Sequence, residues 1–116
     1  MEKLVRGFLK FRGEVFGKKK DFFTRLSQRQ EPRALFITCS DSRVDPALMT
    51  QAEPGELFIL RNAGYMVPPY GWMQGGSTAT IEYGRAVPKV PHIIVCGHTD
   101  CGVMKALLHP QDVHDL

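Results

Sequence analysis

Residues 34–43 have the sequence Ala-Leu-Phe-Ile-Thr-Cys-Ser-Asp-Ser-Arg, a short apolar run followed by a cysteine and then by polar residues. Pro32 comes just before the run and favours extended backbone, so the pattern predicts a buried β-strand over residues 34–38. Two similar runs follow at residues 57–60 and 92–96, and turn residues border each of them. Continuous apolar strands of this kind are typical of a parallel sheet whose two faces are both covered.

Helical patterns lie before and between these strands. Apolar residues recur at helical spacing from Leu4 to Val15, and Ser77 is the expected N-cap of a helix that begins at a Gly-Gly pair and ends before Pro88. We therefore predict helices over residues 3–16, 21–28, 75–87 and 102–108. Strands alternating with helices predict an α/β fold, with a parallel β-sheet core flanked by helices on both faces and an N-terminal helical arm.

The composition is that of a soluble globular domain. The chain has 116 residues, of which 43% are hydrophobic and 23% charged, enough for one domain and too few for two. The apolar stretches are far shorter than the roughly 20 residues of a membrane span, and the first residues lack the apolar core of a signal peptide. We therefore expect no membrane partner and a cytoplasmic location.

The charge is unevenly distributed along the chain. Residues 1–33 hold ten Lys or Arg and four Asp or Glu, and they include the run Lys18-Lys19-Lys20. No base-stacking or groove-reading motif accompanies the run, which favours a solvated helix face over a nucleic-acid patch. We expect no nucleic-acid partner.

Three residues suited to a metal follow two of the predicted strands. Cys39 comes after the first strand, and His98 and Cys101 come after the third. In a parallel sheet these positions share the carboxyl edge, where open α/β folds place their sites. Two thiolates and an imidazole favour Zn²⁺, and three protein ligands leave a fourth position for water, as catalytic zinc sites require. Cys96 lies inside an apolar strand and is expected to be a core residue.

Asp41 and Arg43 leave two interpretations of this site open. If Arg43 holds the Asp41 carboxylate through charge-assisted hydrogen bonds, the fourth metal position is free and the site is catalytic. If Asp41 turns to the metal, the site is closed and only fastens two strand ends together. Structural zinc sites prefer four Cys or His ligands, which favours the open site.

The two motifs together resemble those of a known enzyme family. Cys39-Ser-Asp-Ser-Arg43 and His98-Thr-Asp-Cys-Gly102 are similar to the CxDxR and HxxC signatures of the β-class carbonic anhydrases. Intervening segments such as Glu53-Pro-Gly-Glu-Leu-Phe58 and Arg61-Asn-Ala-Gly64 also resemble the family in order and spacing. Val67-Pro68-Pro69-Tyr70 is similar to the plant-type branch, in which the aspartate is expected off the metal.

The resemblance implies a role for each matching residue. Cys39, His98 and Cys101 would bind one Zn²⁺ per chain, and Asp41 and Arg43 would form the catalytic gating dyad. The substrate would be bound by four further residues: Gln30, Phe58, Tyr83 and Gly102. The implied enzyme is a zinc lyase, a carbonic anhydrase, in which zinc-bound hydroxide reversibly hydrates carbon dioxide to bicarbonate and a proton.

The resemblance also implies how the chain is organised. Residues 1–116 would form a single domain of this family, with a helical arm at 1–30 and an α/β zinc-binding core at 31–116. Family members are about twice as long, so the domain is expected to be incomplete at its C-terminus. The arm packs on a neighbouring subunit in the family, which implies a homodimer or a higher homo-oligomer.

Two alternatives belong to other functional classes. One is a non-catalytic, truncated fragment that binds zinc without turnover. The other is a thiol redox protein, which is disfavoured because the chain has no Cys-x-x-Cys pair.

Overall fold

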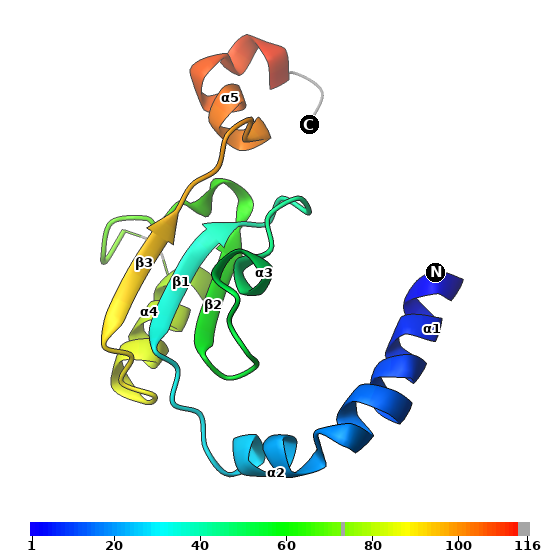
Figure 1. The fold of residues 1–116 in the computed structure, drawn as a ribbon. Coiled ribbons are helices and arrows are strands. Elements are labelled where there is room, and N and C mark those ends of the chain that lie inside the picture. The colour runs from blue at the N-terminus through cyan, green and yellow to red at the C-terminus, as the bar shows by residue number, and fades with distance from the viewer. Residues whose placement is uncertain (73, 114–116) are drawn as a thin grey trace. The chain divides into compact units, whose positions relative to one another are not determined.

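A computed structural model describes residues 1–72 and 74–113 of the chain (Figure 1). The chain divides into two compact units, Met1–Gln30 and Glu31–Leu116. Within the described ranges, no helix is both long and apolar enough to cross a membrane.

The N-terminal unit is helical. It consists of α1 (Glu2–Lys10), a π-helical segment η1 (Phe11–Phe16) and α2 (Lys20–Gln28). The predicted helix over residues 3–16 therefore changes its winding at Phe11. In a π-helix residues five apart face the same side, and the Phe11 and Phe16 rings lie 6.4 Å apart between centroids. Both rings also pack on Phe23 of α2, at 5.8 and 5.1 Å.

The second unit is built on a parallel three-stranded sheet, which confirms the predicted α/β fold. The strands are β1 (Ala34–Cys39), β2 (Leu57–Asn62) and β3 (His92–Cys96), in the order β2-β1-β3. The helices are α3 (Pro46–Thr50), α4 (Gly76–Ala86) and α5 (Gly102–Leu108), with short 3₁₀ segments η2 (Ala63–Tyr65) and η3 (Pro110–Val113). Figure 1 shows α4 behind the sheet and α3 in front of it.

The core of this unit lies between the sheet and α4. Leu35, Ile37 and Leu60 alternate along β1 and β2, and together with Val90 they are buried, with Phe58 and Ile81 packed against them. All six residues of β1 are buried, since it is the central strand. The central strand thus fixes Cys39, its last residue, at the carboxyl edge of the sheet.

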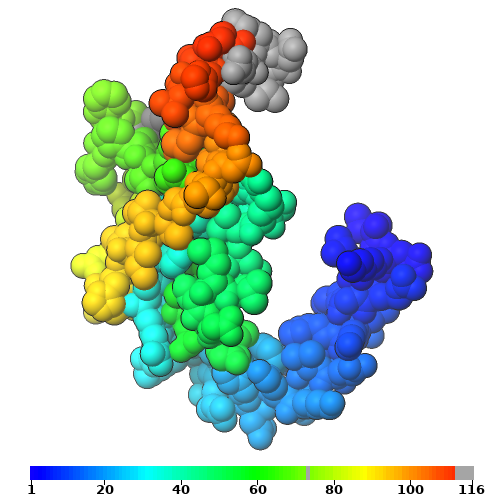
Figure 2. All heavy atoms as spheres, turned by 45° about the horizontal axis from the view of Figure 1, so that its top comes forward, coloured from blue at the N-terminus to red at the C-terminus, as the bar shows by residue number. Residues whose placement is uncertain are grey.

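The prediction that all three strands are buried is wrong for β3. Ile93, Ile94 and Val95 are 48%, 42% and 60% exposed. Side chains of successive strand residues point to opposite faces, so both faces of β3 are open among the described residues. Figure 2 shows this yellow-to-orange segment at the surface. The cause is strand order, because β3 is an edge strand and α4 packs on β2, the strand at the opposite edge of the sheet.

One local prediction about a helix start needs correction, and one short helix was not predicted. The N-cap of α4 is Gly75, not Ser77, and the cap makes no side-chain hydrogen bond. The Ser77 hydroxyl instead accepts a hydrogen bond of 3.0 Å from the Asn62 amide. The sequence reading also missed α3, although Asp45 caps it by accepting from the Leu48 amide at 2.9 Å and Pro46 follows the cap.

Candidate metal centre

The sheet brings Cys39, His98 and Cys101 together. Cys39 ends β1, and the other two residues belong to the loop between β3 and α5. The register pairs Thr38 with Cys96, so the chain leaves β3 beside the end of β1. The Thr38 hydroxyl also donates to the Cys96 carbonyl at 2.8 Å, which fixes the two strand ends to each other.

The geometry of these three side chains fits a tetrahedral metal ion. Their ligand atoms lie within 4.8 Å of one another, and the two sulfur atoms are 3.9 Å apart. With Zn–S bonds of about 2.3 Å, a tetrahedral site places two sulfurs about 3.8 Å apart. Nε2 of His98 is buried and has no hydrogen-bond partner among the described residues, which is the state of an imidazole nitrogen placed to bind a metal. Cys96 is half-buried and is not in this group.

The surroundings of Cys39 favour its thiolate. The Asp41 backbone amide, then the neighbouring His98 side chain and the Gly64 amide, lower the pKa of the Cys39 thiol to about 7. A metal binds the thiolate and not the thiol. The site is therefore prepared to bind a cation near neutral pH.

Gly64 brings its amide to Cys39 in a position that only glycine tolerates. Its φ is +73°, and a Cβ there would lie 2.7 Å from Cγ1 of Val103 on α5. The missing side chain therefore lets η2 pack closely against α5, and the same backbone stretch faces the thiol.

Arg61 holds the loop that carries Asp41. Its guanidinium donates to the carbonyls of Cys39, Asp41 and Val44 at 2.8–2.9 Å. The sequence reading missed this role, although Arg61 is a charged residue that interrupts the end of an apolar strand. Three backbone acceptors on one side chain fix the path of the loop from the sheet edge to Arg43.

Arg43 holds Asp41 by both carboxylate oxygens. Nε donates to Oδ1 at 3.0 Å and Nη2 donates to Oδ2 at 2.7 Å, while the Arg43 backbone amide also donates to Oδ1. These bonds hold the pKa of the Asp41 carboxyl well below its usual range and raise that of Arg43. Oδ2 of Asp41 lies 4.0 Å from Nε2 of His98. Of the two arrangements left open above, this one has Asp41 paired with arginine.

A second carboxylate that the sequence reading did not single out also contacts Arg43. Asp100 accepts from Nη1 at 3.1 Å through its carboxylate and from Nη2 at 3.1 Å through its carbonyl. Its other carboxylate oxygen accepts from Lys105 on α5. Lys105 and then Arg43 lower the pKa of Asp100.

Of the residues expected to bind substrate, Gly102 lies beside the cluster, whereas Phe58 and Tyr83 lie elsewhere in the same unit. Phe58 and Tyr83 stack on each other, 6.0 Å between ring centroids. Phe58 is in register with Leu35, four residues before Cys39, which is about 13 Å along the strand. Gly102 is next to Cys101 and begins α5, and Gln30 is the last residue of the N-terminal unit.

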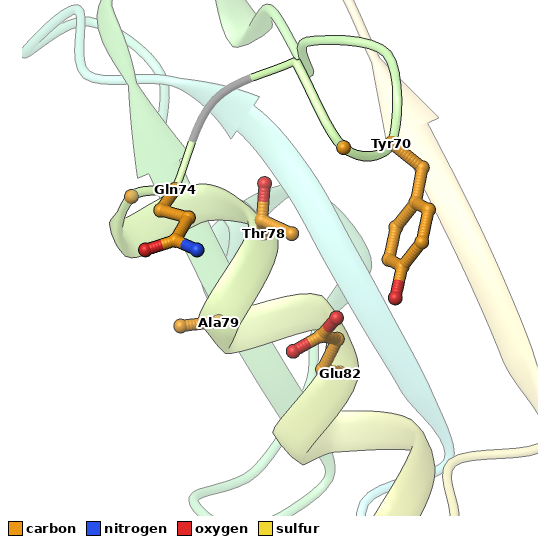
Figure 3. A pocket seen from close by; sticks show the side chains of 7 residues that line it. Tyr70, Gln74, Thr78, Ala79 and Glu82 are labelled. Carbon is orange, nitrogen blue, oxygen red and sulfur yellow. The ribbon is translucent and has the colours of Figure 1, made fainter.

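A separate shallow cavity of about 300 Å³ lies beside the first turns of α4 (Figure 3). Tyr70 faces α4 from the preceding loop, and Thr78 and Glu82 line the helix side of the cavity. The cavity holds none of the proposed metal ligands.

Known proteins resemble this chain in sequence and in structure. Residues 34–115 match the family model described as carbonic anhydrase. A carbonic anhydrase of Synechocystis sp. is 53% identical over 108 residues, covering 93% of this chain and 39% of that protein. The structure of the β-carbonic anhydrase CcaA matches with a TM-score of 0.94 and 50% identity, over 99% of this chain and 52% of that one.

A further solved structure describes tetrameric β-carbonic anhydrases from the ascomycete Sordaria macrospora. It matches with a TM-score of 0.82 and 34% identity, over 92% of this chain and 53% of that one. The chain thus spans about half the length of the relatives that it matches. Because the family model covers most of the sequence and the α/β fold is shared with β-class structures, this chain belongs to the β-carbonic anhydrase family.

Proposed function

We propose that this chain carries the metal centre of a carbonic anhydrase that reversibly hydrates carbon dioxide to bicarbonate and a proton. The observation that carries the proposal is the meeting of Cys39, His98 and Cys101 at one sheet edge, beside an aspartate that an arginine holds ionised. In this proposal the three residues hold one Zn²⁺ per chain. Zinc bound there supplies Lewis-acid activation of water, whose pKa falls to about 7 in such sites.

Asp41 is the acceptor in the proposed reaction. Arg43 keeps the pKa of the Asp41 carboxyl low, so this carboxylate is ionised throughout the neutral range and can only accept hydrogen bonds. Its Oδ2, 4.0 Å from the His98 nitrogen, is close enough to the cluster to orient a water or hydroxide by accepting its proton in a hydrogen bond. An oriented nucleophile lowers the barrier because its lone pair points at the substrate carbon before reaction.

Gln30 and the Gly102 amide are the proposed donors to substrate oxygens, and Phe58 with Tyr83 is the proposed apolar wall. Because Phe58 lies about 13 Å along the strand from the level of Cys39, its ring is proposed to serve the cluster of a second copy. Gly84 supports that wall, since a Cβ at this position would lie 3.2 Å from the Phe58 ring. We therefore propose a homodimer or higher homo-oligomer, with the Sordaria tetramers as precedent in the family. A cytoplasmic location remains a prediction from the sequence.

The deciding experiment measures zinc content and carbon dioxide hydration on the same purified chain. We expect about one zinc per chain and a hydration rate above the buffer blank that disappears after chelation and returns with added zinc. A chain that holds no zinc after reconstitution contradicts the metal site.

A second candidate is a metal-binding fragment without turnover. It is favoured by one observation, that the chain spans 39% of the Synechocystis relative and 52% of CcaA. Stoichiometric zinc without hydration would establish this candidate and would exclude the catalytic proposal for this chain.

A further inference from the structure

Asp100 joins the two loops that carry the proposed metal ligands. Asp41 and Arg43 belong to the loop after β1, whereas Asp100 belongs to the loop between His98 and Cys101. The Arg43 guanidinium bridges the loops because Asp41 occupies Nε and Nη2 on one side while Asp100 occupies Nη1 and a share of Nη2. All three guanidinium nitrogens therefore have acceptors.

Asp100 is itself fixed in place. Its backbone is left-handed, with φ +60°, a conformation that aspartate and asparagine adopt more readily than most residues. Its second carboxylate oxygen is taken by Lys105 on the second turn of α5, so the carboxylate is held between two cations. The four side chains Asp41, Arg43, Asp100 and Lys105 form a row in which the charge alternates and each side chain contacts the next.

We propose that Asp100 is a positioning residue that holds Arg43 on Asp41 and thereby keeps the Asp41 carboxylate off the Cys39–His98–Cys101 cluster. The inference rests on the proposed metal site. The geometry supplies the reason: Asp41 Oδ2 is already only 4.0 Å from the His98 nitrogen, so a small rotation suffices to bring the carboxylate to a metal held there. Arg43 opposes that rotation only while its own guanidinium stays in place.

Arg43 needs such a partner because its side chain is largely in solvent. It is 60% exposed, and an exposed arginine paired with a single carboxylate changes rotamer easily. A second acceptor from another loop restricts the guanidinium to the one orientation that reaches both carboxylates. Lys105 acts one step further out, because it fixes the carboxylate that fixes Arg43.

The first measurement concerns the metal-free chain and needs no activity. In Asp100→Asn we expect hydrogen exchange at Arg43 Nε, followed by ¹⁵N NMR, to become at least about threefold faster than in the unaltered chain. Asparagine keeps the size and tolerates the left-handed backbone, so the fold should be retained. Asp100→Glu should recover part of the protection, and Lys105→Gln should give a smaller acceleration than Asp100→Asn.

The second measurement uses Co²⁺ as the metal and azide as a ligand for its open position. In Asp100→Asn, Asp41 should compete for that position, and we expect azide affinity to fall about three- to tenfold. Loss of a negative charge by itself would change azide affinity in the opposite direction, because it would raise the affinity for an anion. In an Asp41→Asn background the Asp100→Asn change should have no effect, because the competing carboxylate is gone.

Glu56→Gln is the matched control. It removes a half-buried carboxylate that pairs with Arg33 at 3.2 Å and accepts from the Glu53 amide at 2.8 Å, at the amino ends of the strands. Because this carboxylate is far from Arg43 along the strands and glutamine keeps an acceptor oxygen, the change should leave both measurements unchanged. Azide affinity that is unchanged or higher in Asp100→Asn overturns the inference, as does unchanged exchange at Arg43. If the unaltered chain fails to bind Co²⁺, the proposed function fails, and the exchange measurement then decides whether Asp100 positions Arg43.

Discussion

The carboxyl ends of the strands and the edge strand β3 differ in how completely the described residues pair their polar groups and cover their apolar side chains. At the carboxyl ends, Arg61 donates hydrogen bonds to three loop carbonyls, and Arg43 donates to two carboxylates. Both cysteines of the cluster are 4% exposed. Along β3, Val95 is 60% exposed, and Ile93 and Ile94 are 48% and 42% exposed. The loop carbonyls and carboxylates are paired in the first region, where His98 Nε2 is left without a partner among the described residues, and apolar groups are left in water in the second.

This difference separates what one copy of the chain completes from what it leaves open. Hydrogen bonds in the ligand loops are local to residues 39–44, 61 and 98–105, so a single chain can build the metal centre. Apolar surface gains about 25 cal/mol per Å² when it is covered, and β3 leaves much of that gain unrealised within the chain. We therefore expect metal binding to be a property of the single chain and full activity to be a property of an assembly.

The largest effect should come from removing a cluster ligand. Cys39→Ser is expected to lower zinc affinity by more than about a hundredfold, a loss larger than that from changing a residue that only supports a ligand. Zinc per chain after gel filtration, measured by inductively coupled plasma mass spectrometry, tests this. Cys96→Ser is the control and should keep its zinc. A Cys39→Ser chain with stoichiometric zinc would refute the ligand assignment and the contrast between the regions.

The Asp41→Asn variant should keep its zinc but have a much lower rate of carbon dioxide hydration. Asparagine preserves the size but removes the anionic acceptor, so hydration should fall about a hundredfold, in the range of acid–base contributions. Stopped-flow hydration with a pH indicator, on protein of known zinc content, measures it. An Asp41→Asn variant at the unaltered rate would show that the carboxylate has no part in the reaction.

Arg61→Gln should act through the loop and not through a ligand. Losing guanidinium bonds to the carbonyls of Cys39, Asp41 and Val44 should weaken zinc binding about tenfold, at the lower end for supporting residues. Competition with a chromophoric chelator gives the affinity. Arg33→Gln, at the opposite end of the strands, should leave it unchanged; equal losses in both variants would point to a general effect of charge.

A substitution on β3 should have the smallest effect on folding. Its main effect should be on the association of the chain. Val95→Lys changes an exposed residue, so the unfolding free energy of the dissociated chain should shift by no more than about 0.5 kcal/mol in urea. Sedimentation velocity at micromolar concentration should show the unaltered chain associated and the variant shifted toward the 13.1 kDa monomer. A fully active, folded monomer of the unaltered chain contradicts the expected assembly.

Much of the fold follows from local pattern. The three apolar runs became β1, β2 and β3, and the helical periods became helices within a residue or two, because burial periodicity is local to each segment. Ser77 misled because a serine near a helix start resembles a cap, whereas the Asn62 side chain takes its hydroxyl. The helix α3 was missed because five residues are too few to show a period.

The sequence by itself determined the set of residues that could bind a metal, the aspartate–arginine pair beside them and the parallel α/β fold. Each of these can be recognised from residues that lie close together in the chain. Tertiary structure alone decided that Asp100 reaches Arg43 across 57 residues, that Arg61 closes the Cys39 loop, and that β3 lies open. All three depend on the strand order β2-β1-β3. Local patterns do not contain that order, because it is set by which strands find partners and which remain at an edge.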